Sequence, residues 1–499
     1  MADKAGAAWR PRSLLPPEPL PNMLRTSSML CAVAALLTAT DALAQATLTP
    51  LPGFGTGGWI APGTYPFLGT ANNERGLAYN PTTGNLLLVS RTAPTSIQVL
   101  SGVTGANLAT PFDMTGITGG TFVVSMIDVG DDGAIYVANL ATTAALPFKV
   151  YAWAAEALGP ATPATLAYTS TGLLPRVGDS FAVRGLYPSG KFAASGSATT
   201  GNSQFLVGTV DATNAGTAFT SVGGTTLTSN DYRLGLTFVD DDTLIGNQGS
   251  AGGPARMTTF DTSVPSATVD ASINVGGAAR RPLDYTTILG RPVLALIDSN
   301  NSQVTVLDIS VPAAPKVLAQ GNNTTGTLAA NGNGVGSVCW GPVIGNTAVL
   351  YAMSTNQGIQ AFQFTVAPLA STATFGTGCD GLGLAAVGLP VIGNTNFSLD
   401  VTNVPVVSPI GFVGIGYTAI PGGIDLTADG MPGCFLYNLL EIGVFNGGPV
   451  VSGTSNFLLG IPNTPSLANA LISTQGASLS LATPLGYASS NGLNFVIGY

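Results

Sequence analysis

The sequence predicts an all-β protein, a β-propeller followed by a small antiparallel β-sandwich. Three observations lead to this prediction. Short β-rich runs recur about every fifty residues up to residue 366, and glycine is abundant, with 65 residues among 499. A fixed period of this length with several short strands per unit is the signature of propeller blades. After residue 368 the period ends while short alternating runs continue, which is typical of a sandwich.

The composition excludes several classes of protein. Only 8% of the residues are charged, so the surface must consist mainly of Thr, Ser, Asn and Gly. The chain contains no histidine, which removes the commonest general base, the commonest zinc ligand and every Ser-His-Asp arrangement. The net charge of −9 argues against nonspecific nucleic-acid binding, which depends on Lys and Arg. We therefore predict no cofactor and no nucleic-acid partner.

Residues 1–44 are expected to be a leader. Arg25 supplies a positive region, an apolar run follows from Met29, and Ala42-Leu43-Ala44 forms a cleavage signal before Gln45. This pattern is a secretory signal peptide, too short to span a membrane stably. We predict Met23 as the true start and residues 1–22 as an upstream extension, the alternative being a real leader with a long positive region. The mature protein would be secreted, either extracellular or in the cell envelope, without a transmembrane span.

The propeller is predicted over residues 46–368, and its first repeat shows the pattern. Residues 75–90 read RGLAYNPTTGNLLLVS, two β-rich runs around a turn, which is a hairpin signal. The tight turns between first and second strands align at six anchors: Gly84, Gly133, Gly190, Asp242, Gly290 and Gly345. Six anchors favour six blades, and seven remain open if residues 52–70 form a degenerate unit. Residues 47–51 could complete the sixth blade and close the ring.

The remaining strands follow from the anchors. Second strands are predicted at residues 86–89, 134–138, 192–194, 243–245, 293–297 and 348–352. Third strands are predicted at residues 148–153, 205–210 and 304–309.

The C-terminal module, residues 372–499, is expected to form the sandwich. Its predicted strands are residues 396–402, 411–417, 434–437, 457–459, 477–481 and 493–497. The module has no Lys or Arg, because the last cation in the chain is Lys316. Cys379 and Cys434 are expected to form a disulfide, as is usual in secreted proteins. Cys339 is expected to be a free, buried apolar residue.

Two sets of motifs resemble known families. Runs such as TGGTFVVSMIDVGDDGAIYVANL, PFKVYAW and RVGDSFAVRG, with the hairpin of residues 75–90, resemble an uncharacterised family of secreted β-propeller proteins, a domain of unknown function. This resemblance covers about residues 70–360 and implies a fold and an extracellular setting, but no functional residues. The runs FGTGC, GCFL and SSNGLNFVIG resemble a β-module attached to many secreted bacterial proteins, which implies an accessory or anchoring role.

Arginine placement predicts a ligand site. Four arginines precede or open an innermost strand, six to nine residues before an anchor turn, and are expected to ring one mouth of the channel: Arg75, Arg184, Arg233 and Arg281. The loops after the second strands open on the same face and carry Arg91, Asn139, Asn247 and Asp298. Guanidinium groups bind carboxylates and other anions through paired hydrogen bonds. The alternative is that each arginine bridges to an acidic residue of the next blade, with Glu74, Asp179, Asp231 and Asp284 at hand.

Two aspartate clusters are candidates for calcium but are better explained as turns. Asp128, Asp131 and Asp132, and the run at residues 240–242, lack the spacing of a calcium loop and lie at hairpin turns. No metal site is therefore predicted.

These features predict a binding or scaffold protein, expected to be a monomer, that recognises a glycan, a peptide or a small anion at the central face. The C-terminal module could attach it to the cell surface. Two alternatives remain open: a propeller hydrolase or lyase acting on sugars or lactones, and a structural component of the envelope. No catalytic residues are predicted, and a fold alone does not decide among these functions. Carboxylates facing the channel about 5–9 Å apart would favour the hydrolase.

Overall fold

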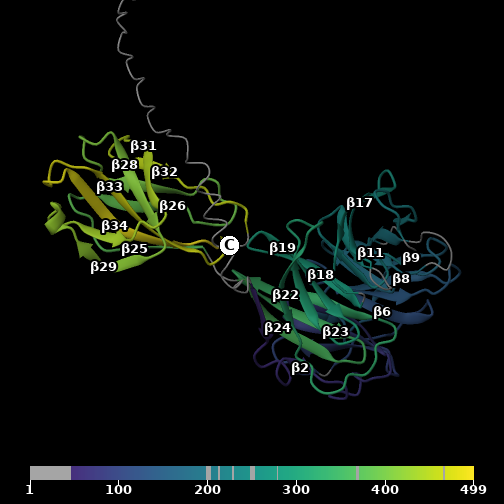
Figure 1. Ribbon diagram of the computed structural model, residues 1–499. Coiled ribbons are helices and arrows are strands. Elements are labelled where there is room, and N and C mark those ends of the chain that lie inside the picture. Colours follow the sequence, from purple (N-terminus) through teal and green to yellow (C-terminus); the bar gives the residue numbers. More distant parts are fainter. Residues whose placement is uncertain are drawn as a thin grey trace, which may run out of the picture. The chain divides into compact units, whose positions relative to one another are not determined.

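The computed structural model describes residues 46–108, 110–197, 204–211, 214–227, 230–247, 253–277, 279–366, 370–464 and 467–498. The predicted leader and its signal peptide lie outside these residues. The chain divides into two compact units, one ending at Ala370 and the other spanning Ser371–Ile497. Both consist of antiparallel strands (Figure 1). No helix among the described residues is long and apolar enough to cross a membrane.

The first unit is a six-bladed β-propeller, as the sequence predicts. Its innermost strands contact one another in the cyclic order β3, β6, β10, β14, β18, β22 and back to β3. Blades 1 and 2 comprise β3 (Glu74–Asn80), β4 (Asn85–Ser90) and β5 (Ser96–Ser101), then β6 (Phe122–Val129), β7 (Ile135–Leu140), β8 (Phe148–Trp153) and β9 (Thr165–Ser170). Blades 3 and 4 comprise β10 (Ser180–Arg184), β11 (Lys191–Ser195), β12 (Phe205–Thr209) and β13 (Gly216–Phe219), then β14 (Gly235–Phe238), β15 (Thr243–Asn247), β16 (Ala255–Asp261) and β17 (Ser266–Ile273). Blade 5 comprises β18 (Arg280–Ile288), β19 (Arg291–Asp298), β20 (Val304–Asp308) and β21 (Lys316–Gly321).

The sixth blade closes the ring with the N-terminal strand. It comprises β22 (Gly336–Ile344), β23 (Thr347–Ser354), β24 (Ile359–Val366) and β1 (Ala46–Pro50), and β2 (Trp59–Ile60) pairs with the far end of β24. Strand β1 runs antiparallel to β24, from Ala46 opposite Val366 to Pro50 opposite Phe362. The predicted completion of this blade is therefore confirmed. Among the described residues of segment 52–70, β2 is the single strand, so no seventh blade forms there.

Apolar side chains fill each of the six interfaces between blades. In β7, Ile135 and Val137 pack against blade 1, whereas Tyr136 and Ala138 pack against blade 3. This alternation follows from the period of two in a strand, which sends successive side chains to opposite faces of the blade. Because both faces of each sheet are covered by neighbouring blades, the strands have nearly continuous apolar sequences.

The predicted anchor turns lie in the hairpins that join the first strand of each blade to the second. Gly84 and Gly133 have φ of +74° and +84°, a backbone conformation that residues with a Cβ rarely adopt. At Gly133, an added Cβ would also lie 2.2 Å from Oγ1 of Thr82 in blade 1. Glycine at this turn therefore serves both the hairpin and the packing of two blades.

The second unit is an antiparallel β-sandwich, in agreement with the predicted fold class. One sheet has the order β25-β34-β33-β28-β31, a second has the order β26-β27-β32, and β29 pairs with β30. Its strands are β25 (Ser371–Phe375), β26 (Gly383–Val387), β27 (Ser398–Thr402), β28 (Ile410–Gly416), β29 (Ala419–Asp425), β30 (Phe435–Asn438), β31 (Gly443–Pro449), β32 (Ser455–Leu458), β33 (Leu471–Leu479) and β34 (Tyr487–Val496). Side chains from both larger sheets meet in one core that includes Leu399, Val413 and Phe495. Two short 3₁₀ turns, η2 (Glu156–Leu158) in the propeller and η3 (Thr427–Asp429) in the sandwich, are the described helical segments.

The cysteines are placed as predicted. Cys379 and Cys434 form a disulfide within the second unit, with their Cα atoms 5.0 Å apart. Cys339 is a free, buried thiol in the apolar cluster between blades 6 and 1. Burial raises the pKa of this thiol well above its ordinary value, so Cys339 behaves as an apolar residue.

Candidate functional site

Arginines gather at one mouth of the propeller, where the innermost strands begin. Arg75 is the second residue of β3, Arg176 and Arg233 precede β10 and β14, and Arg91 follows β4. These four line a cavity of about 200 Å³, together with Phe122, Ser125, Leu140, Asp179, Asn333 and Val335. We call it the arginine cavity. Its lining residues come from five blades or the loops that lead into them, and the ring closure brings them together.

One buried carboxylate holds two of the arginines. Asp179 accepts hydrogen bonds from Nε and Nη2 of Arg176 at 2.5 and 2.7 Å, and from Nε of Arg233 at 3.1 Å. The Asp179 side chain is 4% exposed, while those of Arg176 and Arg233 are 26% and 27% exposed. The bond to Asp179 raises the pKa of Arg176. Both guanidinium groups are therefore fixed in place and still reach the solvent in the cavity.

The other two arginines have no carboxylate partner among the described residues. Arg75 donates from Nη2 to the carbonyl oxygen of Asn72 at 2.8 Å, and its Nε is buried without a hydrogen-bond partner. Arg91 donates from Nε to the carbonyl oxygen of Val124 at 3.2 Å and from Nη2 to Oγ of Ser125 at 2.7 Å. Neutral acceptors thus orient both cations without balancing their charge.

The electrostatics reflect this shortage of anions. Burial, together with the charges of Arg75 and Arg176, lowers the pKa of Arg91 to about 9, against the opposing effect of Asp179. Burial also lowers the pKa of Arg75, and the charges of Asp179 and Glu74 offset part of that effect. Guanidinium groups are protonated at neutral pH, and the cavity lining places four of them beside one carboxylate, that of Asp179.

Three of the four predicted ring arginines lie at this mouth. The prediction was wrong for Arg184, which lies at the opposite mouth. Arg281 is the second residue of β18 at the same end of the propeller, and its pKa is lowered by burial and by the charge of Arg233. Arg184 instead ends β10, where it pairs in register with Lys191 at the hairpin. It forms an exposed ion pair with Asp241 at 2.6 Å. The loop between β10 and β11 is longer than the corresponding loops of the other blades. Arg184, six residues before the anchor Gly190, therefore lies at the last residue of β10, whereas the other three arginines lie near the start of an innermost strand.

The predicted amides and Asp298 serve the backbone. Asn139 donates to the carbonyl oxygen of Pro147 at 2.9 Å and accepts from the backbone of Lys149. Asn247 donates to the carbonyl oxygens of Arg280 and Arg281. Asp298 accepts the backbone N–H groups of Asn300 and Asn301, as aspartates in turns do. Their ligand-binding role remains a prediction, and the contacts favour Arg91 over these three residues.

No sequence pattern placed Arg176 or Phe122 in this site, whereas Asp179 was predicted as a possible carboxylate partner of an arginine on the next blade, which it is for Arg233. One signal was available: Arg75, Arg233 and Arg281 each lie nine residues before their anchors (84 − 75, 242 − 233, 290 − 281), whereas Arg184 lies six before its anchor (190 − 184). A constant offset would have singled out Arg184 as the exception. No such spacing marks Phe122, because its place in the cavity depends on how blade 2 packs beside blade 1.

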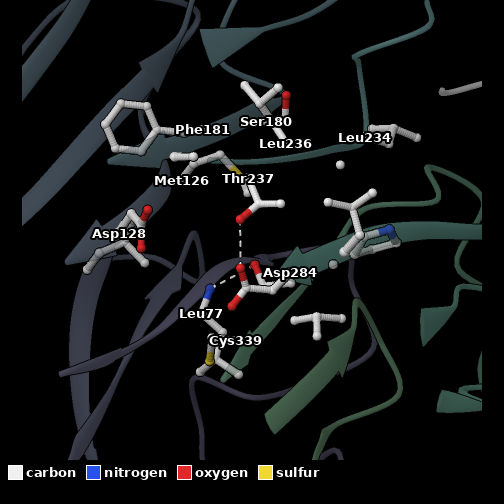
Figure 2. A pocket seen from close by; sticks show the side chains of 18 residues that line it. Leu77, Met126, Asp128, Ser180, Phe181, Leu234, Leu236, Thr237, Asp284 and Cys339 are labelled. Carbon is white, nitrogen blue, oxygen red and sulfur yellow. Dashed lines mark hydrogen bonds between the residues drawn. The ribbon is translucent and has the colours of Figure 1, made fainter. Parts of the chain in front are cut away.

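The centre of the channel holds a second, smaller cavity with two carboxylates. Figure 2 shows Asp128 and Asp284 beside this cavity of about 70 Å³. Asp128 accepts the backbone N–H groups of Val129 and Val183 at 2.9 and 2.6 Å. Asp284 accepts hydrogen bonds from Thr237 and the backbone of Tyr285 at one oxygen, and from the backbone of Trp340 at the other.

These two carboxylates connect neighbouring blades. Val183 belongs to blade 3 and Trp340 to blade 6, so each aspartate bonds the innermost strand of the blade that follows its own. Burial raises the pKa of Asp128 to about 7 and that of Asp284 to about 6. Since all four oxygens accept hydrogen bonds, the contacts favour a role in holding the blades together.

The aspartates at the opposite mouth also belong to turns. Asp131 and Asp132 accept the backbone N–H groups of Gly185 and Tyr187 across the blade interface. Among the described residues, no group of three or more Cys, Asp or Glu side chains is arranged to hold a metal ion.

Comparisons with known proteins give a family resemblance and no curated relative. Two solved structures from Bacteroides are similar: a DUF4623 family protein from B. eggerthii (16% identity, TM-score 0.47, covering 60% of this chain and 72% of that one) and a protein of unknown function from B. thetaiotaomicron (12%, 0.42, 64% and 76%). Regucalcin, a calcium-binding protein from Agrobacterium tumefaciens, is also similar (12%, 0.37, 63% and 95%). At TM-scores below 0.5, none of these similarities carries an inference for this chain. No curated protein matches the sequence. The resemblance predicted from the propeller motifs is nevertheless confirmed, because residues 65–222 match the model of an uncharacterised family, the domain of unknown function DUF4623.

Proposed function

We propose that this protein is an exported binding protein whose propeller recognises an anionic group in the arginine cavity. One observation carries the proposal: Arg75 and Arg91 line the same cavity, and neither forms an ion pair with a described residue. The disulfide between Cys379 and Cys434 fits a secreted protein. A role of the second unit in attaching the protein to a surface is part of the same proposal.

Two desolvated cations without a directly bonded carboxylate are unfavourable in the unliganded protein. Burying a charge is costly unless it is paired, and like charges repel at short range. Arg75 is 9% exposed, and its Nε is buried without an acceptor. Surfaces that serve stability alone avoid such arrangements, whereas binding sites retain them because the ligand supplies the missing charge.

The orientation of the guanidinium groups supports anion recognition. Protein acceptors fix Arg91 through Nε and Nη2, and Asp179 fixes Arg176 through the same two atoms. The remaining N–H donors are thereby held in place before a ligand arrives. Such pre-organisation increases affinity, because little side-chain freedom is lost on binding.

Isothermal titration of the mature protein with acetate and with sulfate at low ionic strength tests the proposal. We expect binding that weakens as salt is added, because salt screens charge interactions. Arg75→Met and Arg91→Met should each weaken binding by at least about tenfold, since a charge-assisted hydrogen-bond pair contributes at least that much. Arg184→Met is the matched control, because it removes an arginine from the opposite mouth and should leave the affinity unchanged.

Thermal unfolding separates a binding site from a structural strut. Removing a buried cation that forms no ion pair should leave the melting temperature of the unliganded protein unchanged or raise it. A fall in melting temperature for Arg75→Met and Arg91→Met, with no anion bound by the wild-type protein, would show that the arginines support the blades and would overturn the proposal.

A further inference from the structure

The arginine cavity has an apolar wall beside its cationic wall. Phe122, Leu140 and Val335 line the cavity together with Arg75 and Arg91. Leu140 and Val335 are 4% and 6% exposed, whereas Phe122 at the start of β6 is 43% exposed. A large aromatic side chain that lines a cavity and remains this exposed offers contact area that the protein itself does not cover.

The charge and the ring are fixed relative to each other. The guanidinium carbon of Arg91 lies 3.9 Å from the centre of the Phe122 ring, a cation–π contact. Because hydrogen bonds to Val124 and Ser125 also hold Arg91, the donor groups and the ring keep one geometry. A ligand that satisfies both must carry its charge next to a body with an apolar face.

Two further hydrogen-bonding groups, one amide and one carboxylate, complete the cavity. Asn333 is exposed at its rim, and its side chain makes no hydrogen bond within the described part of the chain. Within the described residues, Oδ1 of Asp179 accepts one hydrogen bond, from Arg176, and retains capacity for a second donor. An apolar or aromatic acid would leave both groups unused, whereas a hydroxylated ring would bond to them.

We infer that the arginine cavity binds a sugar acid, with the carboxylate of a uronic-acid unit on Arg75 and Arg91 and the ring against Phe122. This inference rests on the proposed function and specifies its ligand class. The cavity of about 200 Å³ is smaller than the roughly 300–1,000 Å³ of pockets for drug-sized ligands, which fits one monosaccharide unit. Hydroxyl groups of that unit would reach Asn333 and Asp179.

The test compares four probes by isothermal titration of the mature protein: glucuronate, galacturonate, glucose and acetate. We expect the better uronate to bind at least about tenfold more tightly than acetate and glucose to show no measurable binding. Phe122→Ala should weaken uronate binding by about tenfold and leave acetate binding unchanged, because acetate has no ring. Val123→Ala, at the next exposed residue of β6, is the matched control and should leave both affinities unchanged.

The outcomes distinguish this inference from the proposed function. If acetate or sulfate binds as tightly as both uronates, or if Phe122→Ala leaves uronate binding unchanged, the sugar-acid assignment is wrong while the anion site stands. If no anion binds the wild-type protein, the proposed function fails as well. Unchanged acetate binding by Phe122→Ala shows that Arg91 keeps its place without the ring, so a loss of uronate binding then reports on the ring contact itself.

Discussion

Two buried carboxylates should give the propeller an unusual dependence on pH. The pKa of Asp128 is raised to about 7 and that of Asp284 to about 6, both from an ordinary value of 3.8, chiefly by burial. The folded state therefore holds more protons than the unfolded state between about pH 4 and pH 7, and stability falls as the pH rises through this window. Denaturant midpoints should thus be higher at pH 5 than at pH 8.

A double variant provides the control for this pH dependence. Asp128→Asn combined with Asp284→Asn removes both titrating groups, so the slope between pH 5 and pH 8 should flatten whatever the absolute stability of the variant. Exposed carboxylates such as Asp113 and Asp261 have pKa values lowered by hydrogen bonds, and their contribution lies below about pH 4. A wild-type protein that gains stability from pH 5 to pH 8 would contradict the expectation.

At the scale of single residues, the sequence predicts that arginines gather at one mouth better than it predicts which residues gather there. Arg75, Arg233 and Arg281 share one offset from their anchors and do share one mouth. Arg184 does not, because the length of its hairpin loop decides which end of β10 it occupies. Phe122 and Asp179 enter the site through the packing of separate blades, which no local pattern encodes.

At the scale of elements, one side chain fixes the hairpin of blade 1. Glu156 in η2 accepts hydrogen bonds from Asn80 at 2.9 Å and Asn85 at 2.6 Å, and a third from Thr83. We expect Glu156→Ala to lower the free energy of unfolding by about 1–3 kcal/mol, because it leaves the partly buried amides without an acceptor. Glu156→Gln keeps one oxygen and the shape, so it should cost less, as urea denaturation would show. Equal losses for both variants would assign the effect to charge alone.

The hairpins themselves were predictable because their determinants are local. The turn residues and the alternating strands lie within about fifteen residues of each other, as in residues 75–90, and β8 begins and ends where the sequence predicts. Long-range elements such as η2 carry no comparable pattern. The role of η2 follows from the hydrogen bonds that Glu156 accepts from Asn80 and Asn85, which lie 76 and 71 residues earlier in the chain.

At the scale of the whole molecule, the fold was predictable because the same local hairpin pattern occurs six times at nearly even spacing. The even spacing of the anchors predicts a ring, and a ring requires that its first and last blades meet. Strand β1 meets that need by pairing with β24 more than three hundred residues away. The arginine cavity, by contrast, exists only after closure, because blades 1 and 2 place Arg75 and Phe122 while the loop into blade 6 places Asn333.

The closing strand provides the last prediction. Leu48 points from β1 into the apolar cluster between blades 5 and 6, where it packs beside Gly321 and Phe362, whereas its neighbour Thr49 is exposed. Leu48→Asp would place an unpaired carboxylate in that cluster and weaken the pairing that closes the ring. We expect a fall in melting temperature of at least about 5 °C, since roughly 2–4 °C accompany each kcal/mol in a large domain. Thr49→Asp adds the same charge to the outer face of the same strand, so it should change the melting temperature by much less. Equal falls in melting temperature for the two variants would mean that the added charge causes the loss, and that packing of Leu48 against the neighbouring blade does not stabilise the closed ring.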